Sequence, residues 1–165
     1  VGLGHLVRCE QGDALDMPFP PACFDVVWTE HVAMNIADKP TLYREMNRVL
    51  KPGGTLAIYD VCCGEGGPVH FPVPWARREE ASFLASPEQL RRLVTEAGFR
   101  ITDWRDTTAE ARDWFAALAE RVRREGPSLL SWGMLMGDDF PAMAQNQRRN
   151  LDEGRIALVQ LVARK

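Results

Sequence analysis

Residues 24–61, FDVVWTEHVAMNIADKPTLYREMNRVLKPGGTLAIYDV, decide the fold class of this chain. The compact apolar run at residues 24–28 is typical of a buried strand in a parallel sheet. A helix with Asp38 as its N-cap is expected next, and Lys51-Pro52-Gly53-Gly54 is expected to end that helix and begin a second strand that reaches Val61. Strand, helix and strand in this order imply a right-handed crossover and a parallel pair of strands.

The rest of the chain continues this alternation on both sides. Strands are expected at 5–10, 99–104 and 156–163, and helices at 86–98, 107–126 and, less regularly, 128–150. The sequence therefore predicts an α/β, Rossmann-like fold with a mostly parallel sheet and flanking helices. We expect one partial domain over residues 1–165, with residues 107–154 as a helical insertion before the last strand.

The composition of the chain limits the classes of function that it suits. The chain has 165 residues, 45% of them hydrophobic and 26% charged, with a net charge of -3, which gives no general attraction to nucleic acid or anionic lipid. No apolar run approaches the roughly 20 residues that span a bilayer, and no signal peptide is recognised. The four cysteines include the adjacent pair Cys62 and Cys63, which lacks metal-ligand spacing, so we expect no metal site and a reducing cytoplasm.

Three blocks carry the chemistry: Gly12-Asp13-Ala14-Leu15-Asp16-Met17-Pro18-Phe19, residues 24–31, and residues 50–60. In this order and at this spacing they closely resemble the class I S-adenosylmethionine-dependent methyltransferases, and the resemblance covers residues 5 to about 106. It implies an enzyme that transfers a methyl group from S-adenosylmethionine to a small-molecule acceptor. The sequence does not decide whether the acceptor atom is N, O or C.

Asp13 follows an expected strand end, where ligands of open parallel sheets bind. A carboxylate there can accept a hydrogen bond from an exocyclic amine while the next backbone N–H donates to a ring nitrogen, a pattern that matches the edge of adenine. The resemblance assigns the amino contact to Asp13, a backbone contact to Ala14 and packing on the ring to Leu15. The alternative for Asp13 is an Asx turn at a strand end.

Thr29, Glu30 and His31 follow the strand at residues 24–28. The resemblance places them against the methionine part of the donor, where Glu30 or the Thr29 carbonyl holds the amino group. His31 is the candidate catalytic residue, because a pKa near 6.5 suits a group that orients the acceptor or removes a proton at neutral pH. The alternative is a loop histidine that satisfies nearby backbone groups.

The candidate acceptor-binding residues are Asn35, His70, Phe71 and Trp75. The last three lie in the Gly- and Pro-rich loop of residues 62–85, which resembles the variable acceptor lid of small-molecule methyltransferases. Phe71 and Trp75 offer flat apolar surface to a substrate or simply anchor the loop, and asparagine is also a common turn former. For Asp60, the interpretation that we prefer is a strand-end cap.

The resemblance also indicates what this sequence lacks. The family's glycine-rich loop and the acidic strand end that holds the ribose do not precede His5, so on the order of 60 residues of the pocket are expected to be missing. The first strands of the methyltransferase fold would then be absent and the edge at residues 24–28 open, which favours a homodimer. The alternative function is a non-catalytic fragment or interaction module that keeps the fold.

Overall fold

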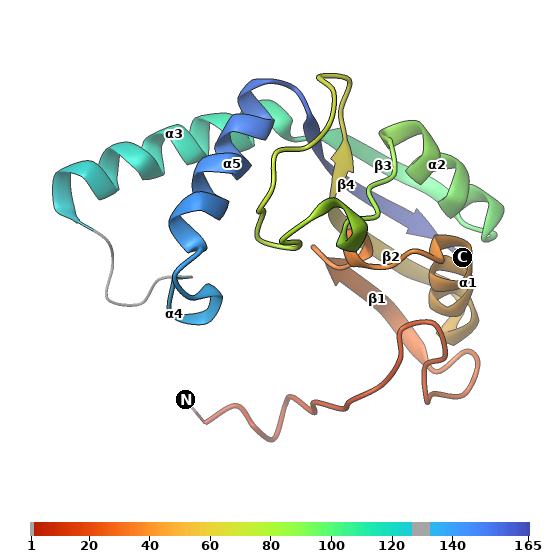
Figure 1. Cartoon of the computed structure of the whole chain (residues 1–165). Coiled ribbons are helices and arrows are strands. Elements are labelled where there is room, and N and C mark those ends of the chain that lie inside the picture. Colours follow the sequence, from red (N-terminus) through yellow and green to blue (C-terminus); the bar gives the residue numbers. More distant parts are fainter. Residues whose placement is uncertain (1, 127–132) are drawn as a thin grey trace.

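The computed structural model describes residues 2–126 and 133–165, and its strands form one sheet in the order β1-β2-β4-β3 (Figure 1). The strands are β1 (Phe24–Glu30), β2 (Leu50–Cys63), β3 (Arg100–Asp106) and β4 (Ile156–Arg164). β1 and β2 are parallel, and β4 runs antiparallel to both β2 and β3. All described strands except β4 therefore point the same way, although only β1 and β2 form a parallel pair. The expected α/β, Rossmann-like fold is confirmed, with a mixed sheet.

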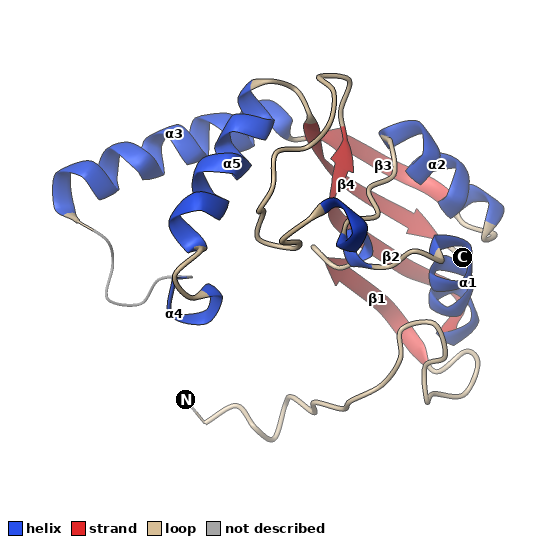
Figure 2. Cartoon of the chain, viewed as in Figure 1, coloured by secondary structure: helices blue, strands red, loops and turns tan. Residues whose placement is uncertain are grey.

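Two helices cover one face of the sheet, α1 (Lys39–Val49) and α2 (Pro87–Glu96) (Figure 2). Both begin where the sequence predicts a cap. Asp38 accepts a hydrogen bond from the Thr41 N–H at 3.0 Å, and Ser86 and Gln89 form a reciprocal capping box. The short 3-10 turns η1 (Ala33–Asn35) and η2 (Glu79–Ala81) lie in the connections before these helices.

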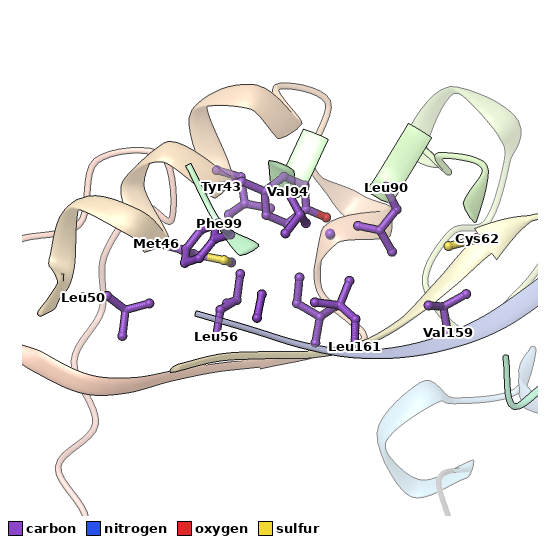
Figure 3. Close-up of a cluster of buried hydrophobic side chains, with 14 residues drawn as sticks. Tyr43, Met46, Leu50, Leu56, Cys62, Leu90, Val94, Phe99, Val159 and Leu161 are labelled. Carbon is purple, nitrogen blue, oxygen red and sulfur yellow. The ribbon is translucent and has the colours of Figure 1, made fainter. Parts of the chain in front are cut away.

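The first core cluster lies between these helices and the sheet (Figure 3). It is formed by buried side chains of α1, α2, β2 and β4, among them Leu42, Tyr43, Met46, Leu56, Leu90, Val94 and Leu161. Because side chains alternate along a strand, every second residue of β2 from Leu56 to Cys62 faces this cluster. The face therefore presents Asp60 to the same buried space.

Among the described residues, helices cover the second face only toward the carboxyl end of β2. The helices α3 (Thr108–Glu125) and α5 (Phe140–Asp152) lie on this side, with the short α4 (Gly133–Met136) before α5 (Figure 1). The second core cluster unites Ala111 and Leu151 with side chains of β2 and β4. Toward the start of β1 the same face is open, and Val26 and Trp28 are 57% and 70% exposed.

Two expectations about the elements are wrong. Residues 5–10 form a turn and coil rather than a strand, because no described strand lies beside them to pair with their backbone groups. Residues Lys51-Pro52-Gly53-Gly54 do not form a turn between helix and strand but lie inside β2. There the register with β1 shifts, with Phe24 opposite Leu50 but Val26 opposite Thr55. Part of the helix expected at 128–150 falls outside the described residues, and α5 accounts for its later part.

Candidate functional site

His31 lies in a constrained turn at the carboxyl end of β1. Its N–H donates to the Tyr59 carbonyl at 2.9 Å, and its φ of 52° lies in the left-handed region that few non-glycine residues adopt. The imidazole lies beside the Tyr59 ring, with centroids 4.8 Å apart and planes inclined at 48°. Backbone pairing and ring contact therefore both fix where this side chain lies.

The surroundings of His31 favour its neutral form. Partial burial lowers the pKa of His31, and the negative charge of the neighbouring Glu30 opposes this shift to a smaller extent. A neutral imidazole at pH 7 can accept a proton or a hydrogen bond from an acceptor molecule. This arrangement suits the role that the sequence suggests for His31.

Glu30 and Thr29 point to opposite faces of the sheet. Glu30 is exposed and lies opposite Tyr59 in the register of β1 and β2, on the side of Trp28. Thr29 is 7% exposed on the side of α1 and α2, and its Oγ1 has no hydrogen-bond partner among the described residues. Of these two side chains, only the Glu30 carboxylate is therefore available to a ligand from solvent.

The structure brings Asn35 and Trp75 together. The Asn35 amide donates to the Trp75 carbonyl at 2.7 Å, and the Trp75 indole N–H donates to Ser82 Oγ at 3.0 Å. The Trp75 side chain also packs against the second core cluster. Both residues thus hold the loop in place. For Trp75 this is the alternative considered from the sequence, and contact of either residue with an acceptor stays a prediction.

His70 is tied to the end of α5. Its Nε2 lies 2.9 Å from Glu153 Oε2, its N–H donates to Asn150 Oδ1 at 2.8 Å, and the Asn150 amide returns a bond to the His70 carbonyl at 3.0 Å. Hydrogen bonds from Arg149, His70 and Arg155 lower the pKa of Glu153 to about 2. The next residue, Phe71, is half-buried.

No local sequence pattern indicates the roles of Asn150 and Glu153. Asn150 is fully buried, at 0% exposure, although asparagine in a helix gives no signal of burial by itself. Their partners in the loop lie about 80 positions earlier in the chain, so no local pattern links them.

Asp13 forms an Asx turn. Its Oδ1 accepts from the Leu15 N–H at 2.8 Å, while Ala14 and Leu15 pack against the first core cluster. The segment that follows is bound to α1, because the Met17 N–H donates to Glu45 Oε2 at 3.0 Å and Arg48 donates to the Met17 carbonyl at 2.9 Å. Among the described residues, no hydrogen bond joins Asp13–Leu15 to Thr29–His31.

The polar groups of this site suit parts of a methyl donor of the S-adenosylmethionine type. The exposed carboxylate of Glu30 at the end of β1 suits a cationic group. Asp13 is exposed and adjoins a backbone amide, as the edge of adenine requires. Within the described ranges, no group of three or more His, Cys, Asp or Glu side chains is placed to hold a metal ion.

Comparison with known proteins identifies the family. Residues 1–58 match the family described as "Methyltransferase domain", and the whole sheet superimposes on solved proteins of that fold. Over these residues the chain is similar to the class I methyltransferases. This family uses S-adenosylmethionine as its methyl donor.

The individual relatives of this chain differ in chemistry. It is 29% identical to the glycine/sarcosine/dimethylglycine N-methyltransferase of Actinopolyspora halophila, over 90% of this chain and 26% of that protein. It is 31% identical to the O-methyltransferase resE of Aspergillus sclerotiorum, over 64% of this chain and 40% of that protein. The crystal structure of the [4+2]-cyclase SpnF matches with a TM-score of 0.69 and 27% identity, over 99% of this chain and 58% of that one. The chain thus spans less than two thirds of each.

Proposed function

We propose that this chain is the later part of an S-adenosylmethionine-dependent methyltransferase that acts on a small-molecule acceptor. The observation that carries the proposal is the turn after β1, in which His31 lies beside the Tyr59 ring and next to the exposed Glu30. A group that accepts protons and a carboxylate that attracts cations then stand together at the ligand-binding end of the strands.

In this proposal Glu30 binds the amino end of the donor, and Asp13, Ala14 and Leu15 contact its adenine. Bound S-adenosylmethionine supplies the electrophilic methyl group. His31 orients the acceptor and takes its proton when the acceptor is a hydroxyl, a step that typically contributes 10²–10⁴-fold. An amine or an acidic carbon needs less help, and the relatives named above include both N- and O-methyltransferases. The acceptor atom is therefore a question for experiment.

A donor-consumption assay on the full-length protein, with amine, phenol and quinol acceptors, tests this function. His31→Gln should lower turnover of a hydroxyl acceptor by about 100-fold or more, while the affinity for S-adenosylhomocysteine stays the same. His5→Gln is the matched control, because His5 is an exposed histidine of the N-terminal segment. Full activity of His31→Gln, or no donor consumption with any acceptor, would contradict the proposal.

The second candidate function is a non-catalytic fragment or interaction module that keeps the fold. One observation favours it: the chain spans only part of the relatives that it matches. We propose that the 165-residue chain alone binds the donor weakly or not at all. Calorimetric titration that finds micromolar binding would refute this.

Other features of the proposed protein follow from its surface and composition. We propose a homodimer that covers the open edge of β1, with α3, α4 and α5 as a helical insertion at 107–154. The four cysteines are all free in the structure, which supports a reducing, cytoplasmic location. No helix among the described residues has the length and apolar character needed to cross a membrane.

A further inference from the structure

Asp60 and Lys39 are two charged residues buried beside the candidate site. Asp60, on β2, is 3% exposed, and Lys39, the first residue of α1, is 8% exposed. Withdrawing a carboxylate and an ammonium from water is costly, and a cation at the start of a helix also opposes the helix dipole. The contacts of this pair must therefore explain why these two side chains lie there.

Every hydrogen bond of these two side chains goes to backbone groups, and most go to one short segment. Asp60 Oδ2 accepts from the Ala33 N–H at 3.0 Å, and its Oδ1 accepts from the adjacent Val61 N–H at 3.0 Å. Lys39 Nζ donates to the Ala33 carbonyl and, at 3.0 Å, to the Ile36 carbonyl. The residue Ala33 is thus held at its N–H by the anion and at its carbonyl by the cation.

This segment continues the turn that carries His31. Tyr59, which accepts from the His31 N–H and lies against its ring, directly precedes Asp60 in β2. Because neighbouring residues of a strand point to opposite faces, the Tyr59 ring and the Asp60 carboxylate approach the turn from opposite sides of the sheet. At the far end of the turn, Asn35 donates to the Trp75 carbonyl.

We propose that Asp60 and Lys39 are positioning residues that fix the turn of residues 31–36 and thereby place His31 and Asn35. The expected effect of this pair on catalysis rests on the proposed function, whereas its expected effect on the position of His31 does not. A pair that served only to stabilise the core would leave the surroundings of His31 unchanged when it is altered.

Histidine ring signals in NMR spectra of the 165-residue chain test the proposal directly, because the chain has only three histidines. In Asp60→Asn and in Lys39→Met, the His31 signals should lose the upfield displacement that the nearby Tyr59 ring causes, while those of His5 stay in place. Lys39→Met keeps the apolar part of the side chain. If Asp60→Asn does not fold, the His31 signals of Lys39→Met therefore test the proposal.

Ile58→Val is the matched control. Ile58 lies on the same strand and the same face as Asp60, is 3% exposed, and its side chain cannot form a hydrogen bond. This variant should leave the His31 signals where they are. Unchanged His31 signals in both Asp60→Asn and Lys39→Met would overturn the proposal.

The methyl-transfer assay, carried out on the full-length protein, separates this proposal from the proposed function. Both variants should lower kcat by about 10- to 100-fold, as expected for a misplaced catalytic group, with little change in the affinity for S-adenosylhomocysteine. Displaced His31 signals in a protein that transfers no methyl group would refute the proposed function and support the positioning role. Displaced signals with an unchanged kcat would overturn the catalytic consequence.

Discussion

Asp60 is a buried carboxyl group whose surroundings favour its neutral form. Burial raises the pKa of Asp60 to about 6, although hydrogen bonds from the Val61 and Ala33 N–H groups and the charge of Lys39 oppose the shift. The folded protein therefore holds this proton more tightly than the unfolded chain, whose aspartate pKa is about 3.9. This contribution to stability is fully present below pH 4 and is lost as the pH rises through 6, with a size on the order of 3 kcal/mol.

Urea unfolding between pH 4 and 7 should reveal this contribution. The free energy of unfolding of the wild-type chain, minus that of Asp60→Asn, should fall as the pH rises through this range. Asp25→Asn is the control, because Asp25 is an exposed partner of Lys51. A difference that does not vary with pH would contradict the prediction. If the prediction holds, the ionised Asp60 lowers stability at neutral pH, which favours a positioning role over a stabilising one.

At the scale of elements, the loop after β2 is bound to the turn between α5 and β4. The Gly64 N–H donates to the Arg155 carbonyl and the Gly66 N–H to the Gly154 carbonyl, both at 2.8 Å. A Cβ on Gly66 would overlap with the Glu153 carbonyl oxygen. The sequence resembles an acceptor lid here. These contacts attach the first part of the loop, at Gly64 and Gly66, to the turn between α5 and β4.

Gly66→Ala should therefore separate the loop from this turn. Overpacking of this kind lowers the free energy of unfolding by about 1–3 kcal/mol, and hydrogen exchange should accelerate in residues 64–75. Gly4→Ala is the control, since nothing lies within 4 Å of a Cβ at that position. If hydrogen exchange in residues 64–75 of Gly66→Ala were unchanged, the contact with the turn between α5 and β4 would not be needed to hold the loop.

Elements that depend on local patterns could be predicted from the sequence, whereas tertiary contacts could not. The caps at Asp38 and Ser86 and the alternation in β2 are local, and the structure contains them. The expected strand at 5–10 is absent because strand formation depends on a neighbour that the sequence pattern does not specify. For the same reason the sequence predicts which residues form the site but not how they contact one another. Asp60 and Ala33 lie 27 positions apart, and no local pattern links them.

At the scale of the whole molecule, the open face beside β1 exposes large apolar side chains to water. Val26 and Trp28 lie there, 57% and 70% exposed, next to an edge of β1 that no described strand covers. The proposed homodimer would bury this surface. Light scattering should then give twice the 18.6 kDa of one chain.

Trp28→Lys should return the dimer to a monomer, because the dimer would have to bury an unpaired charge. Trp114→Lys is the matched control, since Trp114 is 59% exposed on α3, away from the edge of β1. A wild-type chain that is monomeric at all concentrations tested would refute the dimer.

The order of the strands also bears on how the protein is made. β4 lies between β2 and β3, yet it follows both in the sequence, and Thr55 pairs with Arg164. While the ribosome is still extending the chain toward residue 156, β2 and β3 each have an edge without its final partner, and such edges invite wrong pairing. The core is thus completed only after synthesis has passed β4, so the nascent chain exposes these two strand edges until its last strand emerges.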